Sequence, residues 1–117
     1  MSDSVTGIGG VFFRARDPDA LQAWYHEVLG VPRDELMRSD GLVFGIFRED
    51  TEYFGSADQG FMVNFRVASL DAVLERLRAA GAQVDQETRT QEGIGRFGWA
   101  LDPEGNRFEL WEPEEGT

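Results

Sequence analysis

Two hydrophobic patterns follow each other near the start of the chain. Residues 8–15 form a short run of bulky, β-favouring side chains, which predicts a strand. Asp17 is a favourable helix N-cap, Pro18 suits the first helical position, and Gly30 suits the left-handed residue after a helix. Between them the spacing predicts a helix with one apolar stripe, formed by Leu21, Trp24, Tyr25, Val28 and Leu29.

The same order of patterns returns 52 positions later. Residues 61–67 predict a second strand, Ser69 predicts a helix N-cap, and Gly81 predicts the end of that helix. The two stretches align without gaps, and their identical pairs are Val11/Val63, Phe13/Phe65, Arg14/Arg66, Asp19/Asp71 and Ala20/Ala72. We interpret this match as a duplicated structural unit.

Extended segments are predicted after each helix. In the first half they cover about residues 32–38 and 41–48, and in the second half 82–88, 95–101 and 106–112. Asp102 to Asn106 has the composition of a hairpin turn. Each half is therefore a strand, a helix and a short meander. Two halves side by side predict an α+β fold, a curved sheet with both helices on its outer face and a concave cup on the other.

Strand alternation predicts which side chains line the cup. The more uniformly apolar set of each first strand should pack under the helices, so the mixed set should face the cup. The predicted lining is Phe12, Arg14, Met62, Asn64, Arg66, Glu109 and Trp111. Aromatic walls with a few polar groups are typical of small-molecule sites. The alternative is that the arginines only pair with acids such as Glu109, and that the cup is filled or forms a dimer face.

Composition and charge exclude several kinds of function. The net charge is −11, and all 11 basic residues are arginine, so nucleic acid is not an expected partner. The acidic excess could attract a cationic ligand. No apolar run has the length of a membrane span, so no membrane partner is expected. The chain has no cysteine, which excludes thiolate chemistry and fits a cytoplasmic protein. Its one histidine, His26, is expected on a helix surface.

Three segments resemble the vicinal oxygen chelate superfamily, which includes glyoxalase I, bleomycin-resistance proteins and extradiol dioxygenases. They are "GIGGVFFRARDPDALQAWYHEVLGV", "FMVNFRVASLDAVLERLRAAGAQV" and "RFGWALDPEGNRFELWEP". The resemblance implies one glyoxalase-like domain over residues 1–117. This domain would contain two tandem βαβββ modules, at 5–50 and 60–113, with a mixed sheet. The resemblance also implies a homodimer.

The resemblance further implies a divalent metal in the cup, but the residues at the implied positions depart from the family pattern. The first-strand ligand position falls on Gly10, and its mate in the repeat falls on Met62. The late strand of the first half, within 41–48, offers no acid, amide or imidazole. Only Glu109 stands where a family ligand belongs, and a lone carboxylate does not hold such a cation. No cofactor is therefore expected.

Three functions stay open from the sequence. The first is a metal-free protein, similar to the bleomycin-resistance branch, that binds a small organic molecule in the cup. The second is a lyase, isomerase or other enzyme of the glyoxalase type, with Glu109 as general base or metal ligand. The third is a non-catalytic dimeric interaction domain. In that case Tyr53 and Phe54 of the linker would be dimer anchors, unless they only attach the linker to the core.

Overall fold

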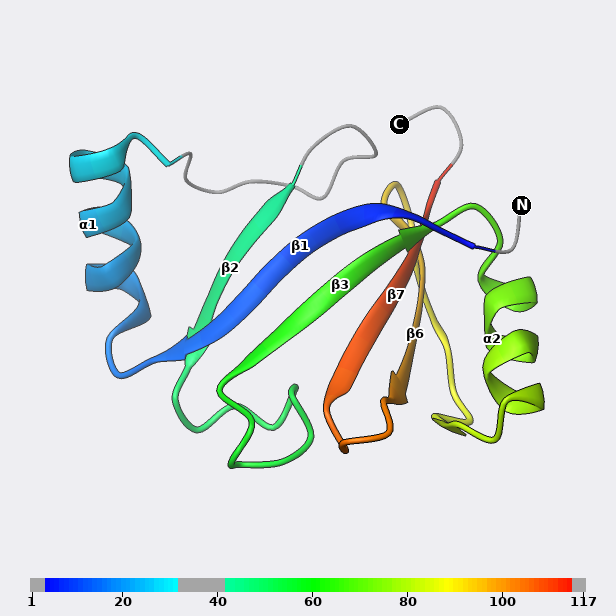
Figure 1. The fold of residues 1–117 in the computed structure, drawn as a ribbon. Helices are drawn as coiled ribbons and strands as arrows, with labels where there is room; N and C mark the ends of the chain where they lie inside the picture. The colour runs from blue at the N-terminus through cyan, green and yellow to red at the C-terminus, as the bar shows by residue number, and fades with distance from the viewer. Residues whose placement is uncertain (1–3, 32–41, 115–117) are drawn as a thin grey trace.

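A computed structural model describes residues 4–31 and 42–114, and it confirms the α+β fold class (Figure 1). The helices are α1 (Pro18–Leu29) and α2 (Leu70–Ala79). The strands are β1 (Val5–Ala15), β2 (Val43–Arg48), β3 (Phe61–Val67), β4 (Gln83–Val84), β5 (Arg89–Gln91), β6 (Gly95–Leu101) and β7 (Arg107–Pro113). Within the described ranges, neither helix has the length and apolar character that crossing a membrane requires.

One mixed, curved sheet contains all seven strands. Its order is β2-β1-β3-β7-β6-β4, and β5 pairs with β6 outside this path. The duplicated first strands, β1 and β3, are antiparallel neighbours at the centre, and each has a parallel neighbour on its other side, β2 and β7 respectively. Figure 1 shows the helices at the two ends of this curved sheet, far from each other. The duplication in the sequence therefore becomes an approximate two-fold arrangement around the β1–β3 pair.

Both helices begin and end close to the residues that the sequence indicated. The Asp17 side chain accepts a hydrogen bond from the backbone N–H of Ala20 at 3.1 Å, and Gly30 follows α1 with φ 75°. The Ser69 side chain accepts from the N–H of Ala72 at 3.2 Å. Such caps satisfy backbone groups that the helix leaves without partners. Local sequence chemistry is therefore sufficient to place both helices.

Two separate apolar clusters lie on the two faces of the sheet. The cluster under α2 consists of Val67, Leu70, Val73, Leu74 and Leu110. The cluster on the cup face consists of Phe12, Phe54, Met62, Phe97, Trp99 and Trp111. Consecutive residues on β7, Leu110 and Trp111, thus belong to opposite faces, as strand alternation requires. The predicted division between helix face and cup face is correct for the strands that carry these clusters.

Of the extended segment predicted over about residues 82–88, only β4 is a strand. The two-residue strand β4 is followed by four residues outside any strand and then by β5. The chain leaves the β6 ladder after the backbone N–H of Asp85 bonds the carbonyl of Trp99 at 2.9 Å, and the Asp85 side chain then accepts from Arg107 at 3.0 Å. The strand predicted at 32–38 lies outside the described residues. The predicted turn is present, since the Asp102 carboxylate accepts from the N–H of Asn106 at 2.9 Å.

A β-bulge in β1 turns two consecutive glycines toward the cup. The β1–β3 register shifts between Ile8 and Gly10, so that Gly9 is the extra residue. A Cβ on Gly9 would overlap Asn64 Oδ1, and one on Gly10 would lie 2.8 Å from the carbonyl oxygen of Val43. Both positions therefore require glycine for close packing.

Replacing Gly9 with alanine is expected to destabilise the protein by about 2 kcal/mol, as overpacking of a closed core does. The added methyl group would meet the side chain of Asn64, which is fully buried, and would lie 3.1 Å from Trp111 Cε3. Urea unfolding measures the change. Gly60→Ala is the matched control, because a Cβ on Gly60 has no atom within 4 Å. If Gly9→Ala and Gly60→Ala unfold at the same urea concentration, close packing at Gly9 does not require glycine.

Candidate functional site

A buried carboxylate forms the floor of the cup. Glu109 lies in the middle of β7 and is only 1% exposed. Its Oε1 accepts a hydrogen bond from Asn64 Nδ2 at 2.6 Å, and its Oε2 accepts from Trp99 Nε1 at 3.0 Å. The Tyr53 hydroxyl also donates to Oε2. A buried charge is tolerated only with such partners.

The partners of Glu109 come from three different parts of the fold. Asn64 on β3 and Trp99 on β6 are its direct neighbours across the sheet on either side. Tyr53 comes from the linker between β2 and β3. Two of the donors are thus fixed by strand register, whereas the third depends on how the linker folds.

Burial raises the pKa of the Glu109 carboxyl group above its ordinary value, and this effect outweighs the hydrogen bonds from Tyr53, Asn64 and Trp99, which lower it. Burial also raises the pKa of the Tyr53 phenol, and the adjacent Glu109 carboxylate raises it further. Tyr53 therefore remains a hydrogen-bond donor throughout the physiological range, and Glu109 is the group of this pair that titrates first.

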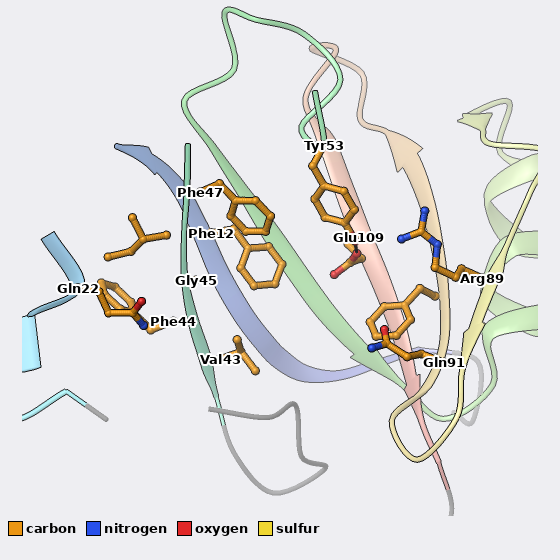
Figure 2. A pocket seen from close by; sticks show the side chains of 12 residues that line it. Phe12, Gln22, Val43, Phe44, Gly45, Phe47, Tyr53, Arg89, Gln91 and Glu109 are labelled. Atoms are coloured by element: carbon orange, nitrogen blue, oxygen red, sulfur yellow. Dashed lines mark hydrogen bonds between the residues drawn. The ribbon is translucent and has the colours of Figure 1, made fainter. Parts of the chain in front are cut away.

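A pocket of about 360 Å³ opens above Glu109 (Figure 2). Its aromatic walls are Phe12, Phe47, Tyr53 and Phe97. The rings of Phe47 and Tyr53 are stacked, with centroids 5.5 Å apart. Arg89 and Gln91, two positions apart on β5, line the wall beyond Glu109. Figure 2 also shows Gln22 and Phe44 on the far side of β2, so the pocket extends around this edge strand.

Arg14 lies on the predicted face, but its hydrogen bonds go to the linker. Its guanidinium group donates to the backbone carbonyls of Glu49, Thr51, Ser56 and Gln59, at distances between 2.7 and 2.9 Å. It also lies 5.0 Å above the ring of Phe54, which is fully buried. Arg14 does not line the pocket above Glu109. The structure therefore gives it a visible role in holding the segment that carries Tyr53.

The other predicted lining residues lie below or beside the pocket. Met62 and Trp111 are fully buried in the cup cluster and do not reach its opening. The guanidinium of Arg66 lies 5.8 Å from the Trp111 ring, and its Nη2 is 3.5 Å from the carbonyl oxygen of Ile8. Of the seven predicted lining residues, Phe12 and Glu109 are the two that line this pocket. The remaining five surround or support it.

The residues at the implied metal positions do not fit a divalent cation. A Cβ on Gly10 would approach the Val43 carbonyl, and a Cβ on Gly45, on β2, would lie 2.5 Å from the ring of Phe12. The Phe12 ring thus occupies the space where ligands from β1 and β2 would stand. Within residues 4–31 and 42–114, no group of three or more His, Cys, Asp or Glu side chains is arranged to hold a metal ion. Glu109 is surrounded by donors, which a cation would have to displace.

The imidazole of His26 and the carboxylates of Glu49 and Glu52 do not line the pocket above Glu109. His26 is exposed on α1, with Nδ1 2.9 Å from the carbonyl oxygen of Val31. Glu49 and Glu52 are exposed on the linker. The aromatic residues next to them face inward, since Phe54 is fully buried and Tyr53 reaches Glu109. Of the two readings of the linker aromatics, attachment to the core of their own chain is the one that the structure shows.

Sequence reasoning missed several residues of the site. It treated Tyr53 only as a linker residue and did not single out Phe47, Arg89, Gln91, Phe97 or Trp99. Trp99 could have been found by alternation on β6, because it shares a face with Phe97 and is paired with Glu109. The contribution of β5 has no comparable signal, since a three-residue exposed strand shows no hydrophobic period.

Comparisons with known proteins agree with this architecture. A glyoxalase-like domain family matches residues 10–111. Methylmalonyl-CoA epimerase from Mycobacterium tuberculosis is similar in structure, with TM-score 0.66 and 23% identity over 94% of this chain and 89% of that one. A variant of the Streptomyces coelicolor methylmalonyl-CoA epimerase, in complex with 2-nitronate-propionyl-CoA, gives TM-score 0.68 and 22% identity over 94% of this chain and 99% of that one.

A Mn(II)-bound glyoxalase from Novosphingobium aromaticivorans is also similar, with TM-score 0.64 and 25% identity. The match covers 92% of this chain but 39% of that one. No curated protein sequence matches the chain. At these identities, the structural likenesses support the fold of the vicinal oxygen chelate superfamily, and the activity has to be argued from the site.

Proposed function

The chain belongs to the glyoxalase-like domain family, and from this premise we propose that it binds a small organic molecule in the cup without a metal ion. The observation that carries this proposal is the aromatic pocket of about 360 Å³ directly above the buried Glu109 carboxylate. Small-molecule sites combine such apolar walls with a few oriented polar groups. The aromatic walls would supply contact area, and Glu109 would orient the ligand.

The residues at the family's metal positions support binding without a cation. Phe12 packs against Gly45 and lies close to Gly10, so the region that would need oxygen or nitrogen ligands is filled by an aromatic ring. The three hydrogen bonds to Glu109 come from neutral donors that are held by the sheet and the linker. These hydrogen bonds offset part of the cost of burying Glu109 and orient it as an acceptor for an organic ligand.

A second candidate is an enzyme in which Glu109 abstracts a proton from the bound molecule. The raised pKa of Glu109 favours this candidate, because a general base is most effective when its pKa lies near the working pH. Arg14 is not placed to stabilise the resulting enolate, because its guanidinium group donates to linker carbonyls. Incubating a bound ligand in D₂O and following its C–H signals by NMR separates the candidates. Exchange that disappears in Glu109→Gln would support catalysis.

The homodimer remains a prediction. On α1, Trp24, Val28 and Leu29 are 50, 58 and 64% exposed, and a partner subunit would be one way to cover them. The interaction-domain function stays the least supported of the three, because Tyr53 and Phe54, its expected anchors, pack inside their own chain. Cytoplasmic localisation also stays a prediction.

A thermal-shift screen of small aromatic and carbonyl compounds tests the proposed function. Compounds that bind in the cup should raise the melting temperature of the wild type and lose most of this effect in Phe47→Leu, because Phe47 forms the stacked wall with Tyr53. Phe61→Leu is the matched control, since Phe61 is 59% exposed and does not line the pocket. Each shift is compared with the variant's own ligand-free melting temperature.

Two outcomes would overturn the proposal. One is that all hits stabilise wild type and Phe47→Leu equally, which would place the binding outside the cup. The other is near-stoichiometric metal in protein purified without chelator, lost in Glu109→Gln, which would make Glu109 a metal ligand. We expect instead that titration with Mn²⁺ or Zn²⁺ leaves the Trp99 environment and the melting temperature unchanged.

A further inference from the structure

We propose that the cup ligand is a planar organic acid with a hydroxyl or amino group opposite its carboxylate, an inference that rests on the function proposed above. The donor group would bind Glu109, and the carboxylate would bind Arg89 and Gln91. Each end of this ligand is argued from a separate feature of the pocket.

The floor of the pocket requires a hydrogen-bond donor. A carboxylate offers about four acceptor positions. Among the described residues, three positions on Glu109 are used, two on Oε2 by Tyr53 and Trp99 and one on Oε1 by Asn64. Oε1 therefore has one acceptor position with no described donor, and Glu109 lines the pocket. A ligand oxygen without hydrogen would be repelled there, whereas a hydroxyl or amino group would complete the set.

The opposite wall requires an anion. Of the described residues that line this pocket, Arg89 is the cationic one, and none of the described ion pairs engages it. Gln91 lies two positions further along β5, on the same side of the strand, and adds an amide donor. A guanidinium group beside an amide is well suited to a carboxylate. The net charge of −11 disfavours an anion over the molecule as a whole, so its binding would depend on this local guanidinium and amide.

Trp99 contacts both ends of the proposed site. Its Nε1 donates to Glu109 at 3.0 Å, and its ring lies 5.6 Å from the guanidinium carbon of Arg89. The Glu109 carboxylate and the Arg89 guanidinium group thus both contact the same indole, one at its N–H edge and the other over its ring. Figure 2 shows Glu109 and Arg89 beside the same space, from β7 and β5, the two strands that flank β6. A single ring with substituents at opposite ends could carry both groups, and Phe12, Phe47 and Phe97 offer aromatic surfaces around it.

Titration calorimetry with three probes tests the proposal. 4-Hydroxybenzoate has both groups, phenol lacks the carboxylate, and benzoate lacks the donor. We expect 4-hydroxybenzoate to bind at least tenfold more tightly than either of the others. Arg89→Gln should weaken 4-hydroxybenzoate at least tenfold and leave phenol unchanged. Glu109→Gln should weaken 4-hydroxybenzoate more than benzoate.

Arg96→Gln is the matched control, because Arg96 is on the adjacent strand but pairs with Asp71 at 3.0 Å and does not line the pocket. It should bind 4-hydroxybenzoate as the wild type does. Equal affinity for phenol and 4-hydroxybenzoate, or an equal loss of both in Arg89→Gln, would overturn the inference. Binding of none of the probes would also overturn it. The thermal-shift screen would then still test the proposed function. Neutral compounds that bind in the cup would support small-molecule binding even though the ligand is not an organic acid.

Discussion

Replacing Arg14 with methionine is expected to destabilise the protein by about 3 kcal/mol and to abolish ligand binding in the cup. The variant keeps the apolar stem over Phe54 but removes four hydrogen bonds from the guanidinium group to linker carbonyls. Hydrogen bonds to charged groups contribute about 1.5–3 kcal/mol each. The sum is smaller here because part of the linker is exposed and its carbonyls can bond to water.

The local effect of Arg14→Met should be visible by limited proteolysis with trypsin. Arg48 stands at the beginning of the linker, and cleavage after it requires the linker to open. The matched control is Leu74→Ala, which creates a cavity under α2 and lowers global stability at a distance from the linker. We expect faster cleavage after Arg48 in Arg14→Met than in Leu74→Ala at equal unfolding free energy.

A second control concerns charge alone. Arg48→Met also removes an arginine near the linker, but Arg48 and its partner Asp50 are both exposed, so little change in stability is expected. If Arg14→Met and Arg48→Met unfold at the same urea concentration, Arg14 does not hold the linker. If a folded Arg14→Met protein still binds the ligand, then binding in the cup does not depend on the contacts between Arg14 and the linker.

The fold could be predicted from the sequence because its signals are local. The caps at Asp17 and Ser69 and the left-handed Gly30 each act within a few residues, and strand alternation assigns Phe12 and Glu109 to the cup without further information. The duplication then adds the long-range pairing, since identical units place β1 beside β3. The helix ends and the faces of the strands depend on residues that are close in the sequence, so they can be predicted from it.

The finer geometry of the site depends on contacts that no local pattern expresses. Arg14 and Arg66 occupy equivalent positions in the repeat, yet one donates to the linker and the other lies over Trp111. The difference arises because only the first half is followed by the linker that supplies carbonyls. Tyr53 reaches Glu109 across 56 positions from a segment without hydrophobic period. Its role follows from the folded linker and not from its neighbours in the sequence.

Glu109 should show the largest contrast between two substitutions at one position. Glu109→Leu leaves Tyr53, Asn64 and Trp99 without an acceptor, and each stranded buried donor costs about 1–3 kcal/mol, so a loss of at least about 3 kcal/mol is expected. Glu109→Gln keeps an acceptor oxygen for Tyr53 and Trp99. Its amide can donate to Asn64 Oδ1, which has no partner in the wild type, after the Asn64 amide rotates.

The stability difference between wild type and Glu109→Gln should depend on pH. Since the folded pKa of Glu109 is raised above its ordinary value of 4.5, the folded protein holds this proton more tightly than the unfolded chain does. The resulting stabilisation is fully present below pH 4.5 and is lost as the pH rises through the folded pKa. Glutamine has no such loss. Wild type should therefore become less stable relative to Glu109→Gln between pH 4.5 and 8, as measured by urea unfolding of both proteins.

The comparison isolates one group, because the two proteins share every other titrating residue and those contributions cancel in the difference. A difference that grows in favour of wild type with rising pH would mean that the donors from Tyr53, Asn64 and Trp99 outweigh burial and hold Glu109 ionised. A constant difference would mean that the two effects balance. With the expected sign, Glu109 is a carboxylate held at a cost in free energy at neutral pH, and a ligand that donates a hydrogen bond to it would reduce that cost.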